Sequence, residues 1–327
     1  MQWLCDVDVE RSRTLATEWQ VDQVYHDHRA CPPADIVLVA TPPSSHAPIT
    51  CSFLERGCHV LCEKPIATRY ADAEQMVHVA RRLARKLSVG MVRRFYPPTS
   101  AARALVASGA LGEIRSVEVE ESVGRWVATA GPAYVSDNAR AGGGVLMETG
   151  SHVLDQVLYV IQPSESQVVE FRDNSLGGPE SDAAGALRLH GRSVDAAVTF
   201  HLSRTAQFRQ RMVITGSLGA AEVPLGSTGH VLIHDSPATV RPGLSALAVT
   251  TADAASEPSA YHHFAAQLRD LARAARSGDE PLADASTVLP SVRLIEECYA
   301  RREPLAEPWV THLCPRLSSS SAESQGA

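Results

Sequence analysis

The run Val60-Leu61-Cys62-Glu63-Lys64-Pro65 joins apolar residues to a Glu-Lys pair, and Pro65 then ends any further strand pairing. Residues 35–43 have the same form, because an apolar run there also ends in polar and Pro residues. Residues 45–57, between the two runs, are expected to form a helix. Strand, helix and strand make the unit of a parallel sheet, whose ligands bind at the carboxyl ends of the strands. Lys64 is therefore either a residue that touches a bound molecule or a surface Lys beside a turn.

The length and composition indicate a globular protein of two domains. The 327 residues allow two domains of about 100–200 residues each, and 44% hydrophobic with 20% charged residues is ordinary for soluble proteins. A net charge of −7 argues against a nucleic-acid partner, which needs a basic surface. No apolar run approaches the roughly 18 residues of a membrane span, and no signal peptide is recognisable.

The seven cysteines are odd in number and include no C-x-x-C pair. Reduced thiols and a cytoplasmic location are therefore expected, rather than disulfides or a zinc site. The 13 His residues are scattered, without a cluster of Cys or carboxylate residues that would complete a ligand set, so no metal site is predicted.

The first part of the chain alternates strands and helices, which predicts an α/β fold with a doubly wound parallel sheet. Asp8 is the expected N-cap of the first helix, and Glu10 lies in its first turn, where an acidic residue is favourable. The expected strands are residues 3–6, 21–26, 35–40, 60–63 and 87–92, and the expected helices are residues 8–19, 45–57 and 70–86.

The pattern changes in the second part of the chain. A helix over residues 99–108, an alternating strand over residues 114–122 and a helix over residues 145–161 come first. Six strand-like runs follow, most of them separated by turn residues, and predict an open, mostly antiparallel sheet. Helices over residues 261–277 and 285–302 end the fold, and the Ser-rich residues that follow are expected to be disordered.

Three polar residues follow the glycine run at residues 142–144. Glu148, His152 and Asp155 stand at positions i, i+4 and i+7 of the expected helix, so they share one face. Gly144 and its neighbours would let a ligand approach the backbone where helical N–H groups are free. In the alternative interpretation, His152 and Asp155 are an ordinary hydrogen-bonded pair packed on the sheet, and Glu148 is solvated.

Together with Glu63 and Lys64, these residues supply a possible acid–base set. Oxidising a secondary alcohol requires a base for the O–H proton while hydride leaves the carbon. An imidazole such as that of His152, whose ordinary pKa is about 6.5, suits the base. A Lys ammonium can stabilise the developing alkoxide.

Asp6 ends the first expected strand. A carboxylate in that position can accept hydrogen bonds from both hydroxyls of an adenosine ribose, and it would repel a 2′-phosphate. This predicts NAD as the cofactor, with NADP less favoured. The alternative is that Asp6 caps the following helix, a role that Asp8 could equally fill.

Four motifs of this chain resemble those of the Gfo/Idh/MocA family, the group of glucose–fructose oxidoreductase and inositol dehydrogenase. The resemblance extends from residue 1 to about residue 310 and is carried by these four motifs. They are Glu63-Lys64-Pro65 for E-K-P, residues 40–46 for A-T-P-P-x-x-H, residues 90–97 for G-x-x-x-R-F-x-P, and residues 142–155 for G-G-G-x-L-x-D-x-G-x-H-x-x-D.

The resemblance implies an NAD(P)-dependent oxidoreductase that acts on a secondary alcohol of a sugar, cyclitol or related compound. It implies a Rossmann domain over residues 1–96, a C-terminal substrate and oligomerisation domain over residues 97–315, and a disordered tail over residues 316–327. The open sheet of the C-terminal domain would form a homodimer or homotetramer.

The resemblance also assigns roles to residues. Lys64 and His152 would be the catalytic pair. The residues expected to line the cofactor are Asp6, Thr41, Pro42, His46, Glu63, Lys64 and Pro65. Those expected at the substrate are Glu148, Arg93, Asp155 and Trp126, with Arg125, Tyr134 and Asn138 as further candidates.

The sequence departs from the family pattern at two points. Glu148 stands where the family has Asp, and no G-x-G-x-x-G occurs anywhere, so the chain begins where the family's second strand should be. In a doubly wound sheet of order 3-2-1-4-5-6 the first strand is central, so residues 3–6 and 35–40 should face a gap. We therefore expect upstream coding sequence for about 25–30 residues, the size of a strand, a Gly-rich turn and a helix.

Two other functions stay open. Some relatives use bound NAD for transient oxidation during glycoside cleavage, so release of an aglycone without net NADH would indicate a hydrolase. The chain could also be a truncated relative that binds a ligand without turnover, which the missing Gly-rich turn favours and the intact Lys64 and His152 oppose.

Overall fold

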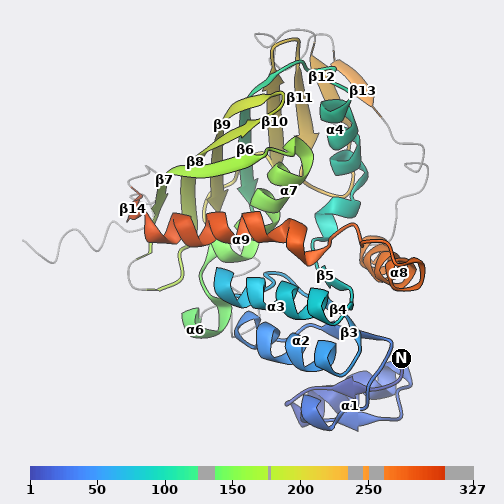
Figure 1. Cartoon of the computed structure of the whole chain (residues 1–327). Helices are drawn as coiled ribbons and strands as arrows, with labels where there is room; N and C mark the ends of the chain where they lie inside the picture. The colour runs from blue at the N-terminus through green and yellow to red at the C-terminus, as the bar shows by residue number, and fades with distance from the viewer. Residues whose placement is uncertain (124–136, 176–177, 235–245, 250–260, 306–327) are drawn as a thin grey trace, which may run out of the picture. The chain divides into compact units, whose positions relative to one another are not determined.

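The computed structural model describes residues 1–123, 137–175, 178–234, 246–249 and 261–305, and Figure 1 shows the course of the chain. Two compact units are formed. Unit 1 comprises Met1–Gly90 and Phe264–Leu289, and unit 2 comprises Met91–His263 and Pro290–Ala327. Residues 264–289, which the sequence alone assigns to the C-terminal domain, thus pack with unit 1. The expected tail, residues 316–327, lies outside the described residues.

Unit 1 contains the parallel strands that the alternating pattern predicts. Its strands are β1 (Leu4–Cys5), β2 (Val24–Tyr25), β3 (Ile36–Val39), β4 (His59–Cys62) and β5 (Leu87–Val89). Its helices are α1 (Val9–Trp19), α2 (His46–Glu55), α3 (Tyr70–Arg82), most of α8 (His262–Ser277) and the start of α9 (Ala285–Ala300), with 3-10 turns η1 (His28–Ala30) and η2 (Pro43–Ser45). All strand pairs in this unit are parallel within the described residues, which confirms the predicted fold class.

The expected gap in this sheet is present. β1 pairs with β2, and β3 pairs with β4 and through it with β5, but no ladder in the described part of the chain joins β1 to β3. Leu38, in the middle of β3, is 51% exposed although Val37 and Val39 beside it are 3% exposed. Since no described strand pairs with it there, the edge of β3 that does not face β4 presents its backbone groups unpaired, and the exposure of Leu38 shows that one face of β3 is uncovered as well.

Local signals fix the helices of unit 1. The carboxylate of Asp8 accepts a hydrogen bond from the Arg11 N–H and caps α1, as predicted. Trp3 stacks on Phe53 of α2 at a ring-centroid distance of 5.6 Å. α3 ends at Arg82, four residues earlier than predicted, because Ala84 adopts a left-handed conformation with φ 52°.

Unit 2 is built on the open, mostly antiparallel sheet that the turn-separated runs predict. Its strands are β6 (Ile114–Ser122), β7 (Glu165–Asp173), β8 (Asp182–Gly191), β9 (Val194–Ser203), β10 (Arg211–Gly216), β11 (Ala220–Pro224), β12 (Val231–His234), β13 (Ala246–Val249) and β14 (Arg302–Pro304). Its helical segments are η3 (Val92–Phe95), α4 (Pro97–Ala107), α6 (Asn138–Ala141), the π-helix η5 (Leu146–Gly150), α7 (Ser151–Ile161) and the rest of α9.

The strand order is β13-β12-β11-β10-β6-β9-β8-β7-β14, and only β6–β9 and β7–β14 are parallel among the described pairs. α4 and α7 lie against one face of the sheet (Figure 1). The sequence did not predict β13 or β14. β14 contains Pro304 and two charged, exposed residues, so its pairing with β7 depends on the sheet and not on local propensity.

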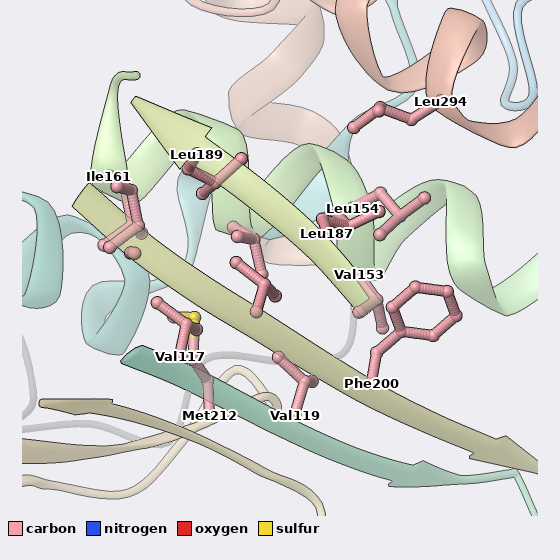
Figure 2. Close-up of a cluster of buried hydrophobic side chains, with 14 of the residues drawn as sticks. Val117, Val119, Val153, Leu154, Ile161, Leu187, Leu189, Phe200, Met212 and Leu294 are labelled. Atoms are coloured by element: carbon pink, nitrogen blue, oxygen red, sulfur yellow. The ribbon is translucent and has the colours of Figure 1, made fainter. Parts of the chain in front are cut away.

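The core of unit 2 lies between this face of the sheet and the helices. Figure 2 shows Val117, Val119 and Phe200 of the strands facing Val153 and Leu154 of α7, with Leu294 of α9 nearby. Phe200 and Leu154 are 0% exposed. Burial of each such side chain stabilises the fold by about 1.5–3 kcal/mol. This packing holds the segment that carries Glu148 and His152.

Candidate active site

Two turns at the carboxyl ends of neighbouring parallel strands carry the predicted site residues of unit 1. Val39 pairs with Cys62 at the ends of β3 and β4, so Thr41-Pro42 and Glu63-Lys64-Pro65 follow strands that end side by side. The Glu63 carboxylate accepts the Lys64 backbone N–H at 2.9 Å, and the Lys64 residue is half-buried. Lys64 therefore lies at the strand end where the parallel-sheet rule expects ligand contacts.

His46 connects these two turns. Its Nδ1 lies 2.8 Å from the Pro65 carbonyl oxygen and its Nε2 lies 2.7 Å from the Thr41 carbonyl oxygen, and the residue is 0% exposed. Burial lowers the pKa of His46, and this effect outweighs the two carbonyl groups and Glu63, which raise it. His46, predicted to line the cofactor, thus lies beneath the turns that carry Thr41 and Pro65.

Asp6 stands at the end of β1 and is half-buried. One of its carboxylate oxygens accepts the Asp8 backbone N–H at 2.8 Å. Asp8, and not Asp6, is the N-cap of α1. The capping role that competed with ribose binding therefore falls to Asp8.

These residues fit one part of a nicotinamide dinucleotide better than another. Asp6, at the end of a parallel strand, is suited to the ribose hydroxyls. The pyrophosphate needs backbone N–H groups at a Gly-rich turn, and the sequence contains no such turn. The position of Asp6 at the ribose therefore stays a prediction, and residues 1–90 contain no Gly-rich turn that would bind the pyrophosphate.

The segment that carries Glu148 and His152 begins differently from the prediction. The expected continuous helix is a π-helix, η5, followed by α7. The Glu180 carboxylate accepts the N–H groups of Gly144 and Leu146 at 3.0 Å each, and the Glu180 carbonyl accepts the Val145 N–H. A Cβ on Gly144 would lie 2.0 Å from the Glu180 carbonyl oxygen. The close approach that Gly144 allows is therefore to Glu180, and these N–H groups are not free for a ligand.

Glu148 and His152 are both half-buried, whereas Asp155 is 2% exposed. The Glu148 carboxylate accepts a hydrogen bond from Nη2 of Arg204 at 3.0 Å. Arg204 follows β9, and its backbone N–H donates to the Ser181 carbonyl at 2.8 Å. Glu148, one helical turn before His152, thus carries an acceptor, and Arg204 brings a donor beside it.

Two consecutive arginines of η3 are paired with carboxylates inside unit 2. Both nitrogens Nη1 and Nη2 of Arg93 contact Glu121, at 2.7 and 2.6 Å. Burial lowers the pKa of Arg93, but the carboxylates of Glu121 and Glu148 raise it, and the net shift is upward. Both oxygens of Asp155 accept from Arg94. The substrate-binding roles of Arg93 and Asp155 stay predictions, and the structure shows that each already has a strong partner.

Trp126, Arg125 and Tyr134 lie outside the described residues, and Asn138 is exposed in α6. No motif of the sequence indicates Arg204, Glu121 or Glu180 as site residues. Arg204 and Glu180 are distant in sequence from the motif they contact, and no motif surrounds them. Lys64 belongs to unit 1 and His152 to unit 2, so their role as a catalytic pair stays a prediction.

Comparison with known proteins gives matches in both units. The family described as "Oxidoreductase family, NAD-binding Rossmann fold" matches residues 1–91, and the "GFO/IDH/MocA C-terminal domain" matches residues 99–222. D-glucoside 3-dehydrogenase of Escherichia coli is 34% identical over 161 residues, which are 48% of this chain and 45% of that protein. The chain spans about half the length of the curated relatives it matches.

Solved structures are similar over most of the chain. An oxidoreductase domain protein from Kribbella flavida is 26% identical, with a TM-score of 0.79, and the match covers 92% of this chain and 87% of that one. Aldose-aldose oxidoreductase from Caulobacter crescentus, solved with glycerol, is also 26% identical, with a TM-score of 0.76 and coverage of 92% and 89%.

The fold, the strand-end motifs and the two matched domains define a two-domain protein of the Rossmann-fold oxidoreductase class. The chain belongs to the Gfo/Idh/MocA family, in agreement with the four motifs found in its sequence. Among the helices that the structure describes, none is both long enough and apolar enough to cross a membrane. The six cysteines of the described residues are free thiols.

Proposed function

We propose that this protein is an NAD-dependent dehydrogenase that oxidises a secondary alcohol of a sugar, cyclitol or related polyol. The observation that carries the proposal is Lys64 at the carboxyl end of β4, in a chain that also retains His152 one turn after Glu148. The names of two relatives support a sugar as the substrate, since one is a D-glucoside 3-dehydrogenase and the other an aldose-aldose oxidoreductase.

The proposal gives each residue one task. His152 accepts the proton of the substrate hydroxyl, and the Lys64 ammonium stabilises the negative charge that develops on that oxygen. When bound, NAD accepts the hydride from the carbinol carbon, so that the alcohol becomes a ketone and NADH and one proton are formed. Glu148 orients a neighbouring hydroxyl by accepting its hydrogen bond.

The cofactor preference follows from Asp6. A carboxylate at the ribose binds the 2′- and 3′-hydroxyls of NAD and repels the 2′-phosphate of NADP. Asp6 is the first carboxylate after β1, and the neighbouring Asp8 is engaged at the start of α1. We therefore propose NAD as the physiological cofactor.

The test is a panel of sugars, cyclitols and glycosides incubated with the protein and NAD or NADP. The proposal expects NADH and a keto product in equal amounts from at least one polyol. Release of an aglycone from a glycoside without net NADH would instead identify a hydrolase that uses NAD transiently. Absence of turnover together with ligand binding would identify a non-catalytic relative.

We also propose that the sheet of unit 2 forms the contact of a homodimer or homotetramer. Residues of β9 alternate between buried and exposed, and Asp195, Ala197, Thr199 and His201 point away from the core. On β7, Val169 is 57% exposed. Sedimentation at several protein concentrations tests this proposal, and Val169→Glu should shift the protein towards monomer.

A further inference from the structure

Arg204 lies beside the proposed site, although no motif of the sequence points to it. Nη2 of its guanidinium donates to Glu148 Oε2 at 3.0 Å, and the Arg204 side chain is 12% exposed. The Glu148 side chain is 32% exposed, so it keeps access to solvent. The pair thus has one largely buried member, Arg204, and one more exposed member, Glu148.

The backbone around Arg204 is held rigidly. The preceding residue, Ser203, is 0% exposed, and its hydroxyl donates to Asp182 at 2.5 Å and accepts the backbone N–H groups of Thr205 and Ala206. The Arg204 N–H donates to the Ser181 carbonyl. These hydrogen bonds hold the backbone of Arg204 in place. A side chain that positions a substrate needs such a fixed backbone.

Arg204 uses fewer of its donors than Arg93 and Arg94 do. Arg93 and Arg94 each use two guanidinium nitrogens on both oxygens of one carboxylate. Arg204 makes one contact, through Nη2. Its Nε is buried, and neither Nε nor Nη1 has a hydrogen-bond acceptor among the described residues. The buried Nε of Arg211 also lacks an acceptor, so the group of Arg204 that is available to a ligand is Nη1.

We propose that Arg204 is a specificity-determining residue that binds the substrate together with Glu148. Nη1 of Arg204 donates to the hydroxyl on one side of the carbinol, while the Glu148 carboxylate accepts from the hydroxyl on the other side. The pair therefore selects polyols that carry a hydroxyl on each carbon next to the carbinol. This inference rests on the proposed dehydrogenase function and adds a residue and a selectivity to it.

Glu148 in place of the family Asp agrees with this arrangement. Glu is one methylene longer than Asp, and its carboxylate reaches Arg204, the residue that directly follows β9. Glu148→Asp shortens the side chain and should lose the contact with Arg204. The substitution should therefore reproduce part of the effect of removing the guanidinium.

The experiment uses methyl β-D-glucopyranoside and its 2-deoxy and 4-deoxy analogues as probes, with NAD and the full chain. Arg204→Met should lower kcat/KM for the parent glucoside about 10- to 100-fold, the loss expected for one charge-assisted hydrogen bond. The same variant should change kcat/KM little for the analogue that lacks the hydroxyl bound by Arg204. Such non-additivity is what a direct contact produces.

Stability separates this role from a structural one. Glu148 can be solvated after Arg204 is removed, so Arg204→Met should leave Tm unchanged or raise it. Arg211→Met is the matched control, since Arg211 is an arginine of β10 that contacts Glu120 and Glu222. This control should retain wild-type kcat/KM on all three probes.

Three outcomes are distinguishable. Equal losses for Arg204→Met on the parent and on both deoxy analogues, or a lowered Tm that accounts for the loss, would overturn the role of Arg204. Wild-type kcat/KM in Arg204→Met would overturn it as well. If the wild-type protein forms no NADH from the glucoside but forms NADH from a polyol that lacks a hydroxyl on a carbon next to the carbinol, the selectivity is overturned and the proposed function stands.

Discussion

Arg94 and Asp155 form a two-point ion pair in which each side chain is 3% exposed. Nε of Arg94 lies 2.9 Å from Oδ2 of Asp155, and Nη2 lies 2.6 Å from Oδ1. The pair ties η3 to α7, three residues beyond His152. It therefore fixes the helix from which the proposed base projects.

Removing one member of this pair should destabilise unit 2 strongly. Asp155→Ala leaves a buried guanidinium without its counter-charge, which costs about 3–5 kcal/mol. Arg94→Lys should also be destabilising, because an ammonium cannot reproduce the two parallel contacts. Urea unfolding of the wild-type protein and of each variant measures the free energies of unfolding. The double variant Arg94→Met with Asp155→Leu should recover much of the loss, and a double variant as unstable as the single ones would contradict this explanation.

Replacing Lys64 should affect the rate far more than the stability. Lys64→Ala removes the charge that stabilises the alkoxide, so kcat should fall about 10²–10⁴-fold. His152→Ala should give a loss of the same order. Lys86, which contacts Glu280 and the Gly278 carbonyl, supplies the control. Lys86→Ala should keep wild-type kcat, and an unchanged kcat in Lys64→Ala would remove Lys64 from the mechanism.

The cofactor preference should depend on Asp6. Asp6→Ser should raise KM for NAD and reduce the discrimination against NADP, because the repulsive carboxylate is gone. The ratio of kcat/KM values for the two cofactors is the measurement. Asp8→Ser, which keeps a capping oxygen at the start of α1, is the matched control and should leave that ratio unchanged. Equal kcat/KM for NAD and NADP in the wild-type protein would show that Asp6 does not lie at the ribose.

His46 should make the stability of unit 1 depend on pH. Because burial lowers the pKa of His46, the folded protein favours the neutral ring relative to the unfolded chain. This contribution is complete above the pKa of an unfolded His, about 6.5, and is lost as the pH falls through the lowered folded value. His46→Gln should therefore show a smaller decrease in the free energy of unfolding on acidification. Identical pH profiles for the two proteins would contradict this.

The elements that depend on local signals were predicted from the sequence. The Asp8 cap, the strand ends at Thr41 and Lys64, and β6 were all placed correctly, because periodicity and turn residues specify them. The gap beside β3 was also predicted, since the order of strands in a doubly wound sheet is known in advance.

Contacts between residues that are distant in sequence could not be predicted from local patterns. The N–H groups after Gly144 were expected to be free, but Glu180, some 36 residues later, accepts them. The same holds for Arg204, 56 residues from Glu148. Spacing alone places Asp155 on the same helical face as Glu148. It predicts neither the π-helix before α7 nor the ion pair of Asp155 with Arg94.

The most direct test of the proposed function follows the carbinol hydrogen. The protein is incubated with NAD and a polyol substrate that carries deuterium on the carbon to be oxidised, and the products are analysed by mass spectrometry and NMR. The dehydrogenase mechanism predicts a keto product without that deuterium and NADH that carries it, in equal amounts. Deuterium that remains in the sugar while an aglycone is released, or unlabelled NADH beside a labelled product, would contradict the transfer of hydride to NAD as the net reaction.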